Sequence, residues 1–175
     1  NSAYFFASLD NMPESWRDDC NVFFGIGLRK EGQSPAILWP VLFADLDTEA
    51  DSAGISMPAG VPLPTATVRS GTGLHLYWKL DGYLAERDEV YLYIRALQNA
   101  LGADPRAAEP DRLLRIPGTK NVKYSPPLNC EVVELHPDRI YTLSDFNLKA
   151  PLEKIEASHD PIAPIEIEYS TIKWP

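Results

Sequence analysis

The sequence is poor in the residues that build zinc fingers, disulfide frameworks and membrane spans. Its 175 residues include two cysteines, Cys20 and Cys130, which lie far apart and form no CxxC pair. Neither a zinc site nor a disulfide framework is indicated, and free thiols in a reducing cytoplasm are expected. No stretch approaches the ~20 apolar residues of a membrane helix, and the N-terminus has no basic-then-apolar signal pattern. These absences predict a cytoplasmic protein without a membrane segment.

Positive charge is also scarce. The chain has 16 Lys and Arg against 25 Asp and Glu, a formal net charge of -9. Because nonspecific nucleic-acid affinity comes mostly from Lys and Arg, this balance excludes a general polyanion-binding surface, and any such contact must be local. The hydrophobic content of 45% suffices for one sizeable core. Since the first residue is Asn1 rather than Met, we expect a fragment of a longer protein.

An apolar run over residues 36–47 ends in two carboxylates two positions apart, Asp45 and Asp47. Side chains alternate along a strand and each residue advances about 3.3 Å, so both carboxylates would lie on one face, roughly 6.6 Å apart, with Leu46 turned into the core. Such a pair can bind hard divalent cations. Alternatively, Asp47 caps a short helix over residues 48–53. Residues 21–28 are rich in strand formers and are predicted to form a hairpin with this run.

Two further strands are predicted over residues 65–70 and 74–80, separated by a glycine-rich break. In the second strand, four apolar side chains point one way, whereas His75, Tyr77 and Lys79 form a polar face. A histidine shortly after two glycines, which let the backbone approach a ligand closely, could donate a hydrogen bond to a phosphate or an acid. The alternative is a solvent-exposed histidine beside a hairpin turn.

The clearest helix is predicted over residues 84–101, where apolar residues recur at helical spacing and Gly102 follows as a C-cap. The local charge then reverses: residues 104–123 contain five bases and three acids, a balance of 5 − 3 = +2. Basic side chains beside a Pro-Gly turn suit phosphate oxygens, although a solvated loop with surface ion pairs has the same composition. Residues 129–135 and 139–143 are predicted as a final pair of strands, and residues 144–147 as a helical turn.

Three motifs resemble, in their order and spacing, those of the archaeo-eukaryotic primase superfamily. They are residues 43–47, residues 70–78, and residues 102–104 running into 112–123. They are most similar to the primase-polymerase domains of plasmid, phage and mobile-element replication proteins, over roughly residues 21–147. The resemblance implies an α+β fold, an RRM-like palm with a mixed or antiparallel sheet plus a second small α/β module. Residues 1–150 would form the catalytic domain, and residues 151–175 an acidic, proline-containing arm or linker.

The family pattern of Asp-x-Asp, small-x-His and hydrophobic-Asp falls on Asp45 and Asp47, on Gly73 to His75, and on Asp104. The three acids would be catalytic and would bind two divalent ions, Mg²⁺ or Mn²⁺. Glu109 or Asp111 could replace Asp104, because one sequence cannot set the register of this loop. The implied nucleotide-binding residues are Ser70, Gly71, Gly73, His75, Arg112, Arg115, Lys120 and Lys123. Some relatives carry a zinc-binding stem, for which this chain has no ligands.

The resemblance implies template-dependent nucleotidyl transfer by a DNA primase or DNA polymerase. The partners would be template DNA, a primer and dNTP or NTP substrates. A flanking helicase or helical domain beyond Pro175 would be a further partner. The alternative is a replication-initiator or nucleotide-binding module that has the same fold without the chemistry.

Overall fold

The computed structural model describes residues 18–30, 35–47, 56–103 and 105–148. It contains mixed strands and one α-helix in this part of the chain. In chain order the elements are β1 (Phe23–Gly25), β2 (Leu28–Arg29), β3 (Ala36–Leu46), β4 (Ala66–Arg69), β5 (Leu74–Leu84), α1 (Arg87–Leu101), the 3-10 helix η3 (Pro105–Ala107), β6 (Leu113–Arg115), β7 (Lys120–Asn121), β8 (Leu128–Asn129), β9 (Glu131–Leu135), β10 (Ile140–Tyr141) and the 3-10 helix η4 (Leu143–Asp145).

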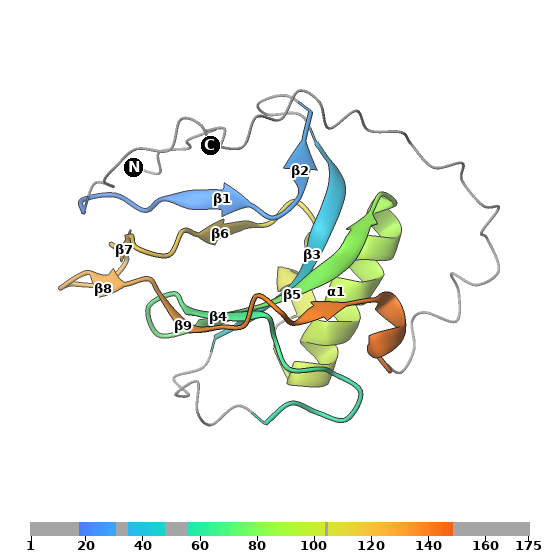
Figure 1. Cartoon of the computed structure of the whole chain (residues 1–175). Helices are drawn as coiled ribbons and strands as arrows, with labels where there is room; N and C mark the ends of the chain where they lie inside the picture. Colours follow the sequence, from blue (N-terminus) through green and yellow to red (C-terminus); the bar gives the residue numbers. More distant parts are fainter. Residues whose placement is uncertain (1–17, 31–34, 48–55, 104, 149–175) are drawn as a thin grey trace.

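A curled, mainly antiparallel sheet forms the centre of the fold (Figure 1). Its order is β2-β3-β5-β4-β9, and the two 11-residue strands β3 and β5 lie in the middle. β10 pairs with β5 in parallel, at Lys79 and Leu80, beyond the stretch of β5 that pairs with β4. The two strands predicted over residues 129–135 and 139–143 are present as β9 and β10, and each joins a different strand of the sheet, β9 pairing with β4 and β10 with β5.

β3 is one continuous strand over residues 36–46 of the predicted apolar run, and Asp45 lies near its end. Pro40 lies within the strand, at an irregularity in the pairing with β5 between Trp39 and Val41. A proline has no N–H to give to a neighbouring strand, so it is accommodated where the ladder is interrupted. Trp39 is 1% exposed, and its indole donates a hydrogen bond of 2.9 Å to the carbonyl of Pro110.

α1 begins at Arg87 rather than at residue 84, because Leu84 still belongs to β5 and pairs with Trp39. Its predicted end is confirmed: Gly102 adopts φ 70°, and its N–H faces the carbonyls of Asn99 and Gln98. Val90, Ile94 and Leu97 are fully buried, as the helical spacing predicts. No helix in the described ranges is long and apolar enough to cross a membrane.

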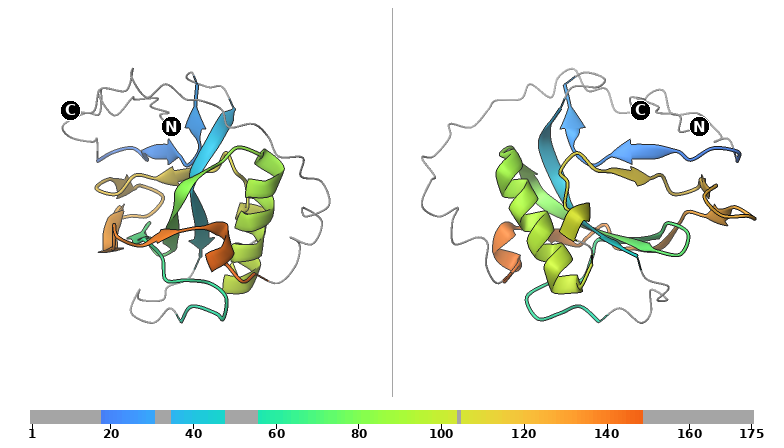
Figure 2. Two further views of the ribbon diagram at one scale, coloured as in Figure 1. Left: turned by 45° about the vertical axis from the view of Figure 1, so that its right-hand side comes forward. Right: turned by 180° about the vertical axis from the view of Figure 1, so that it is seen from behind.

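The central sheet lies between α1 on one side and the two-stranded ribbon of β1 and β6 on the other (Figures 1 and 2). The predicted hairpin of residues 21–28 with β3 is wrong for most of its length. β1 pairs with β6, some 90 residues later, and only Leu28 and Arg29 of β2 pair with β3. The ribbon therefore covers the face of β5 that the sequence predicted to be polar, and Phe24 lies 6.3 Å from Tyr77 between ring centroids.

One buried polar side chain in this core has no matching partner among the described residues. Gln98 of α1 is 0% exposed, and neither its amide nitrogen nor its amide oxygen makes a hydrogen bond there. A buried unsatisfied polar group costs about 1–3 kcal/mol. We expect Gln98→Met, which keeps the length of the side chain without the amide, to raise the free energy of unfolding by about 1 kcal/mol.

Urea unfolding followed by tryptophan fluorescence measures this change, since Trp39 and Trp78 are both buried. Gln98→Glu is the matched control. It keeps the shape and introduces a charge, so its free energy of unfolding should fall. A Gln98→Met variant less stable than the wild type would contradict the expectation.

Candidate functional site

The two carboxylates at the end of β3 face one pocket of about 240 Å³. Asp45 is the second-last residue of β3, and Asp47 follows the strand. Leu46 between them is 7% exposed and belongs to the core, as the alternation of the strand predicts. Both carboxylates thus share one side of the sheet.

Most of the predicted nucleotide-binding residues line the same pocket. Those that do so are Ser70, Gly73, His75, Arg112, Arg115 and Lys123. Gly71 and Lys120 do not line it. Lys120 instead donates a hydrogen bond of 2.6 Å to Asn129, in the ribbon of β7 and β8. The structure thus brings together three segments that the sequence separates by more than 20 residues each.

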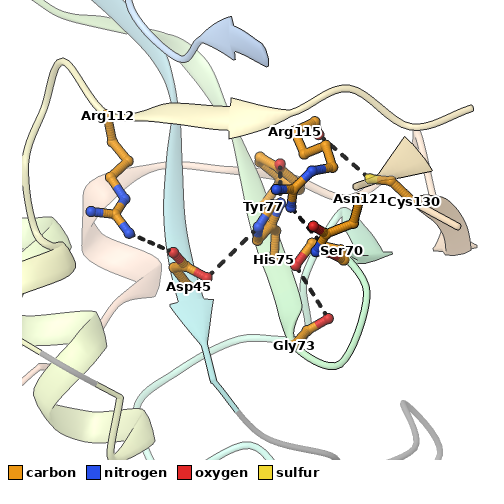
Figure 3. Close-up of polar contacts among 9 residues, drawn as sticks. All are labelled: Asp45, Ser70, Gly73, His75, Tyr77, Arg112, Arg115, Asn121 and Cys130. Atoms are coloured by element: carbon orange, nitrogen blue, oxygen red, sulfur yellow. Dashed lines mark hydrogen bonds and ion pairs between the residues drawn. The ribbon is translucent and has the colours of Figure 1, made fainter. Parts of the chain in front are cut away.

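Asp45 is held between a basic side chain and an imidazole (Figure 3). Arg112 donates a hydrogen bond of 3.0 Å to Oδ2 of Asp45, and Nε2 of His75 lies 3.7 Å from Oδ1. Asp45 and His75 are opposite each other in the pairing of β3 with β5. The carboxylate is 15% exposed, so the Arg112 guanidinium compensates a charge that is largely withdrawn from water.

His75 is buried rather than solvent-exposed. The alternative of a solvent-exposed histidine beside a hairpin turn is wrong, because the β1–β6 ribbon covers this face of β5 and His75 is 4% exposed. Burial lowers the pKa of His75 to about 4; nearby Asp45 raises it, and Arg115 and Arg112 lower it further. At neutral pH the imidazole is therefore uncharged, with one ring nitrogen that donates a hydrogen bond and one that accepts.

Arg115 of β6 ties the glycine-rich loop to the β1–β6 ribbon. Its Nε donates to Oδ1 of Asn21 at 3.3 Å, and its Nη1 donates to the carbonyl of Ser70 at 3.1 Å. Its guanidinium carbon lies 5.1 Å from the ring centroid of Phe23, a cation–π distance. Burial lowers the pKa of Arg115, since the charged form loses water. Nη1 thus holds the glycine-rich loop in position, and Nε binds the segment that precedes β1.

The glycines of the loop make room for protein atoms. The prediction that they allow a ligand to approach is therefore incomplete. Gly71 has φ 119°, and a Cβ there would lie 2.6 Å from Nδ2 of Asn121, which donates to the Ser70 carbonyl at 2.8 Å. A Cβ at Gly73 would lie 2.7 Å from the carbonyl oxygen of Leu46. Both glycines allow the loop to pack against Asn121 and the end of β3.

The two alternative third acids lie away from this pocket. Glu109 and Asp111 both pair with Arg87 of α1, Asp111 at 3.0 Å. Asp111 also pairs with Arg29 at 3.5 Å and accepts the N–H of Ala36 at 3.1 Å. These contacts hold the segment before β6 against α1 and the start of β3. Neither acid lines the pocket, and the contacts that the described residues give them are with Arg87, Arg29 and Ala36.

Carboxylate oxygens of this kind fit a hard divalent cation such as Mg²⁺ or Mn²⁺. Asp45 and Asp47 supply two carboxylates to one pocket, and Oδ2 of Asp45 accepts a hydrogen bond from Arg112. The residues that the structure describes include no group of three or more His, Cys, Asp or Glu that could hold a metal ion. Asp104, the predicted third acid, lies outside them.

Several residues at the site were not predicted from the sequence. The hydroxyl of Tyr77 lies 3.2 Å from Nδ1 of His75. Thr72 and Tyr124 share a hydrogen bond of 3.0 Å at the pocket, and Lys123 lies over the Tyr124 ring at 5.9 Å. The remaining unpredicted members are Asn21, Phe23, Leu113, Leu114 and Asn121. Leu113, Leu114 and Asn121 lie between predicted residues of the basic segment 112–123, and Thr72 lies between the two predicted glycines. Asn21 and Phe23 carried no such signal.

A known protein family matches this chain. The model of the RepB DNA-primase N-terminal domain matches residues 40–139, more than half of the chain. That range contains every residue predicted to bind metal or nucleotide. A search of the curated proteins found no match.

Among solved structures, the fold is similar to the AEP domain of the cyanophage S-2L primase-polymerase (PrimPol), with a TM-score of 0.56 and 18% sequence identity. The similarity covers 69% of this chain and 65% of that one. Identity at this level supports the fold alone. The family model matches more than half of the chain, and the chain belongs to the RepB DNA-primase N-terminal domain family.

Proposed function

We propose that this chain catalyses template-dependent nucleotidyl transfer, as a DNA primase, a DNA polymerase or both. One observation carries the proposal: Asp45 and Asp47 share a pocket with His75, Arg112 and Lys123. Acidic oxygens for cations and basic groups for phosphates are the two requirements of phosphoryl transfer, which depends mainly on positioning and charge stabilisation.

Each residue has a distinct role in this proposal. Asp45, Asp47 and a third acid, Asp104, would hold two divalent cations. Bound there, such cations lower the pKa of a primer 3′-hydroxyl and stabilise charge on phosphate oxygens. Uncharged His75 would donate a hydrogen bond to the triphosphate. Arg112, Arg115 and Lys123 would face the phosphates, and Ser70 and Gly73 would shape the loop beneath them.

The remaining parts of the proposal concern the domain and its partners. The central sheet with α1 would be the palm, and the ribbons β1–β6 and β7–β8 would belong to the second, smaller module. Residues 1–150 would be the catalytic domain, and residues 151–175 an arm or linker outside the described residues. With a net charge of -9, the chain alone would bind template DNA weakly and would need flanking domains or partners.

Incorporation of labelled nucleotides on a defined template tests the proposal. We expect incorporation with Mg²⁺ or Mn²⁺ that stops when EDTA removes the cation and returns when the cation is restored in excess. Reactions with and without a preformed primer separate de novo priming from extension, and parallel deoxy- and ribonucleotide reactions give the sugar preference. Incorporation that is independent of the template or of the cation would contradict the proposal.

The second candidate is a nucleotide-binding or replication-initiator module without catalysis. The ion pair of Arg112 with Asp45 favours it, because an arginine compensates a carboxylate that catalysis would give to a cation. This candidate predicts nucleotide or DNA binding with no incorporation under any of the conditions above.

A further inference from the structure

Tyr77 is in contact with His75 but does not line the pocket itself. Both side chains come from β5, two residues apart, and point to the side of the sheet that the β1–β6 ribbon covers (Figure 3). The Tyr77 hydroxyl lies 3.2 Å from Nδ1 of His75, and the rings meet edge to face at 6.2 Å and 87°. Tyr77 is 9% exposed and His75 4%, so water does not compete freely for this contact.

The Tyr77 hydroxyl has one acceptor in this contact, Nδ1 of His75, and this decides which of the two groups donates the hydrogen bond. His75 Nδ1 is the hydrogen-bond partner that the described residues provide for the Tyr77 hydroxyl. If Nδ1 carried a proton, the phenol oxygen would accept it, and the buried phenol proton would lose its acceptor. Burial raises the pKa of Tyr77, so the phenol keeps its proton. The favourable arrangement is therefore the phenol O–H donating to an unprotonated Nδ1.

A neutral imidazole with an unprotonated Nδ1 carries its proton on Nε2. Nε2 is the nitrogen on the side of Asp45, 3.7 Å from its Oδ1. This distance is too long for a hydrogen bond. Nε2–H can therefore donate to an acceptor oxygen brought into the pocket that Asp45 and His75 line.

We propose that Tyr77 is a positioning residue that fixes the Nε2–H tautomer of His75, so that the ring presents a donor to an anionic oxygen in the pocket. The tautomer follows from the contacts of Tyr77 alone. The identity of the oxygen, a phosphate oxygen of a nucleoside triphosphate, rests on the proposed function. Without the phenol, both neutral tautomers become accessible, and part of the population presents a lone pair to the phosphate.

Nitrogen-15 NMR of protein with labelled histidine rings reads the tautomer directly, and a His75→Gln spectrum identifies the His75 signals. We expect a pyridine-type Nδ1 and a pyrrole-type Nε2 in the wild type. In Tyr77→Phe both signals should move toward the average of two tautomers. Titration with dATP and Mg²⁺ should give an affinity about three- to tenfold weaker than that of the wild type, as for one misaligned hydrogen bond.

Tyr141→Phe is the matched control. Its hydroxyl donates to the Leu63 carbonyl at 2.6 Å, away from the pocket, so removing it should leave the His75 signals and dATP affinity unchanged. A wild-type proton on Nδ1, or an unchanged tautomer in Tyr77→Phe, would overturn the inference. If Tyr77→Phe does not fold, the Tyr77 hydroxyl proton of the wild type decides, since a coupling from it to Nδ1 across the hydrogen bond supports the inference and its absence overturns it. A tautomer that shifts in Tyr77→Phe, in a protein that binds no dATP, supports the role of Tyr77 and contradicts the proposed function.

Discussion

Asp45→Asn and Asp47→Asn should each lower template-dependent incorporation by about 10³-fold or more, while the protein stays folded. Asparagine keeps the size of the side chain and removes the negative charge that a divalent cation requires. Cation ligands contribute several kcal/mol to the stabilisation of transition-state charge, and each 1.4 kcal/mol is about tenfold in rate. Primer-extension rates at saturating nucleotide measure the effect.

The two variants should differ in stability. Asp45 accepts a hydrogen bond from Arg112 and is 15% exposed, whereas Asp47 is exposed. Asp45→Asn weakens this partly buried charged pair, which costs about 1–2 kcal/mol in the free energy of unfolding. Asp47→Asn should leave stability within about 0.5 kcal/mol of the wild type.

Asp81→Asn serves as the control for both variants. Asp81 also comes from a central strand, β5, but it is exposed and does not line the pocket. Its variant should retain the wild-type rate. Primer extension by Asp45→Asn or Asp47→Asn at near the wild-type rate would contradict the two-metal proposal. Loss of extension in Asp81→Asn would show that the assay responds to general destabilisation.

The parts of the fold that could be predicted from the sequence are those that depend on local patterns. β3 was visible as an apolar run that ends in Asp45, and α1 as a 3.6-residue period closed by Gly102. In both elements the pattern that identifies the structure lies within the element itself. The placement of Asp45 and Asp47 beside a buried Leu46 followed from strand alternation in the same way.

The parts that could not be predicted depend on contacts between distant segments. β1 has the composition of a hairpin partner for β3, yet it pairs with β6 at residues 113–115. That pairing covers β5 and turns His75 from an exposed histidine into a buried, uncharged one. Alternation along β5 identified the two faces of the strand. It carried no information on what lies against the second face.

The environment of Ser70 also depends on contacts between distant segments of the chain. Its carbonyl accepts hydrogen bonds from Arg115 and Asn121, which are 45 and 51 residues away in the chain. In the sequence these residues belong to a basic segment that suits phosphates. In the structure they also hold the glycine-rich loop, so one set of side chains both lines the pocket and fixes its wall. Substitutions there will change stability and activity together.

Gly71→Ala should therefore lower the free energy of unfolding by about 2–6 kcal/mol through two separate costs. The first is backbone strain, about 1–3 kcal/mol for a residue with a side chain at φ 119°. The second is steric: the new Cβ would lie 2.6 Å from Nδ2 of Asn121. Asn121 is 5% exposed and would have to give up its hydrogen bond to the Ser70 carbonyl, a further cost of about 1–3 kcal/mol for the unsatisfied groups.

Gly82→Ala separates these two costs. Gly82 has nearly the same φ, 114°, and a Cβ there would meet nothing within 4 Å. It should show only the strain, and the small gain from a less flexible unfolded chain is common to both variants and cancels in the comparison. Urea unfolding gives the two free energies. Incorporation, measured where both variants are fully folded, should fall in Gly71→Ala alone, because displaced Asn121 releases the Ser70 carbonyl beside the pocket. Equal destabilisation of the two variants would mean that Asn121 moves aside without cost and that the loop is not held by this contact.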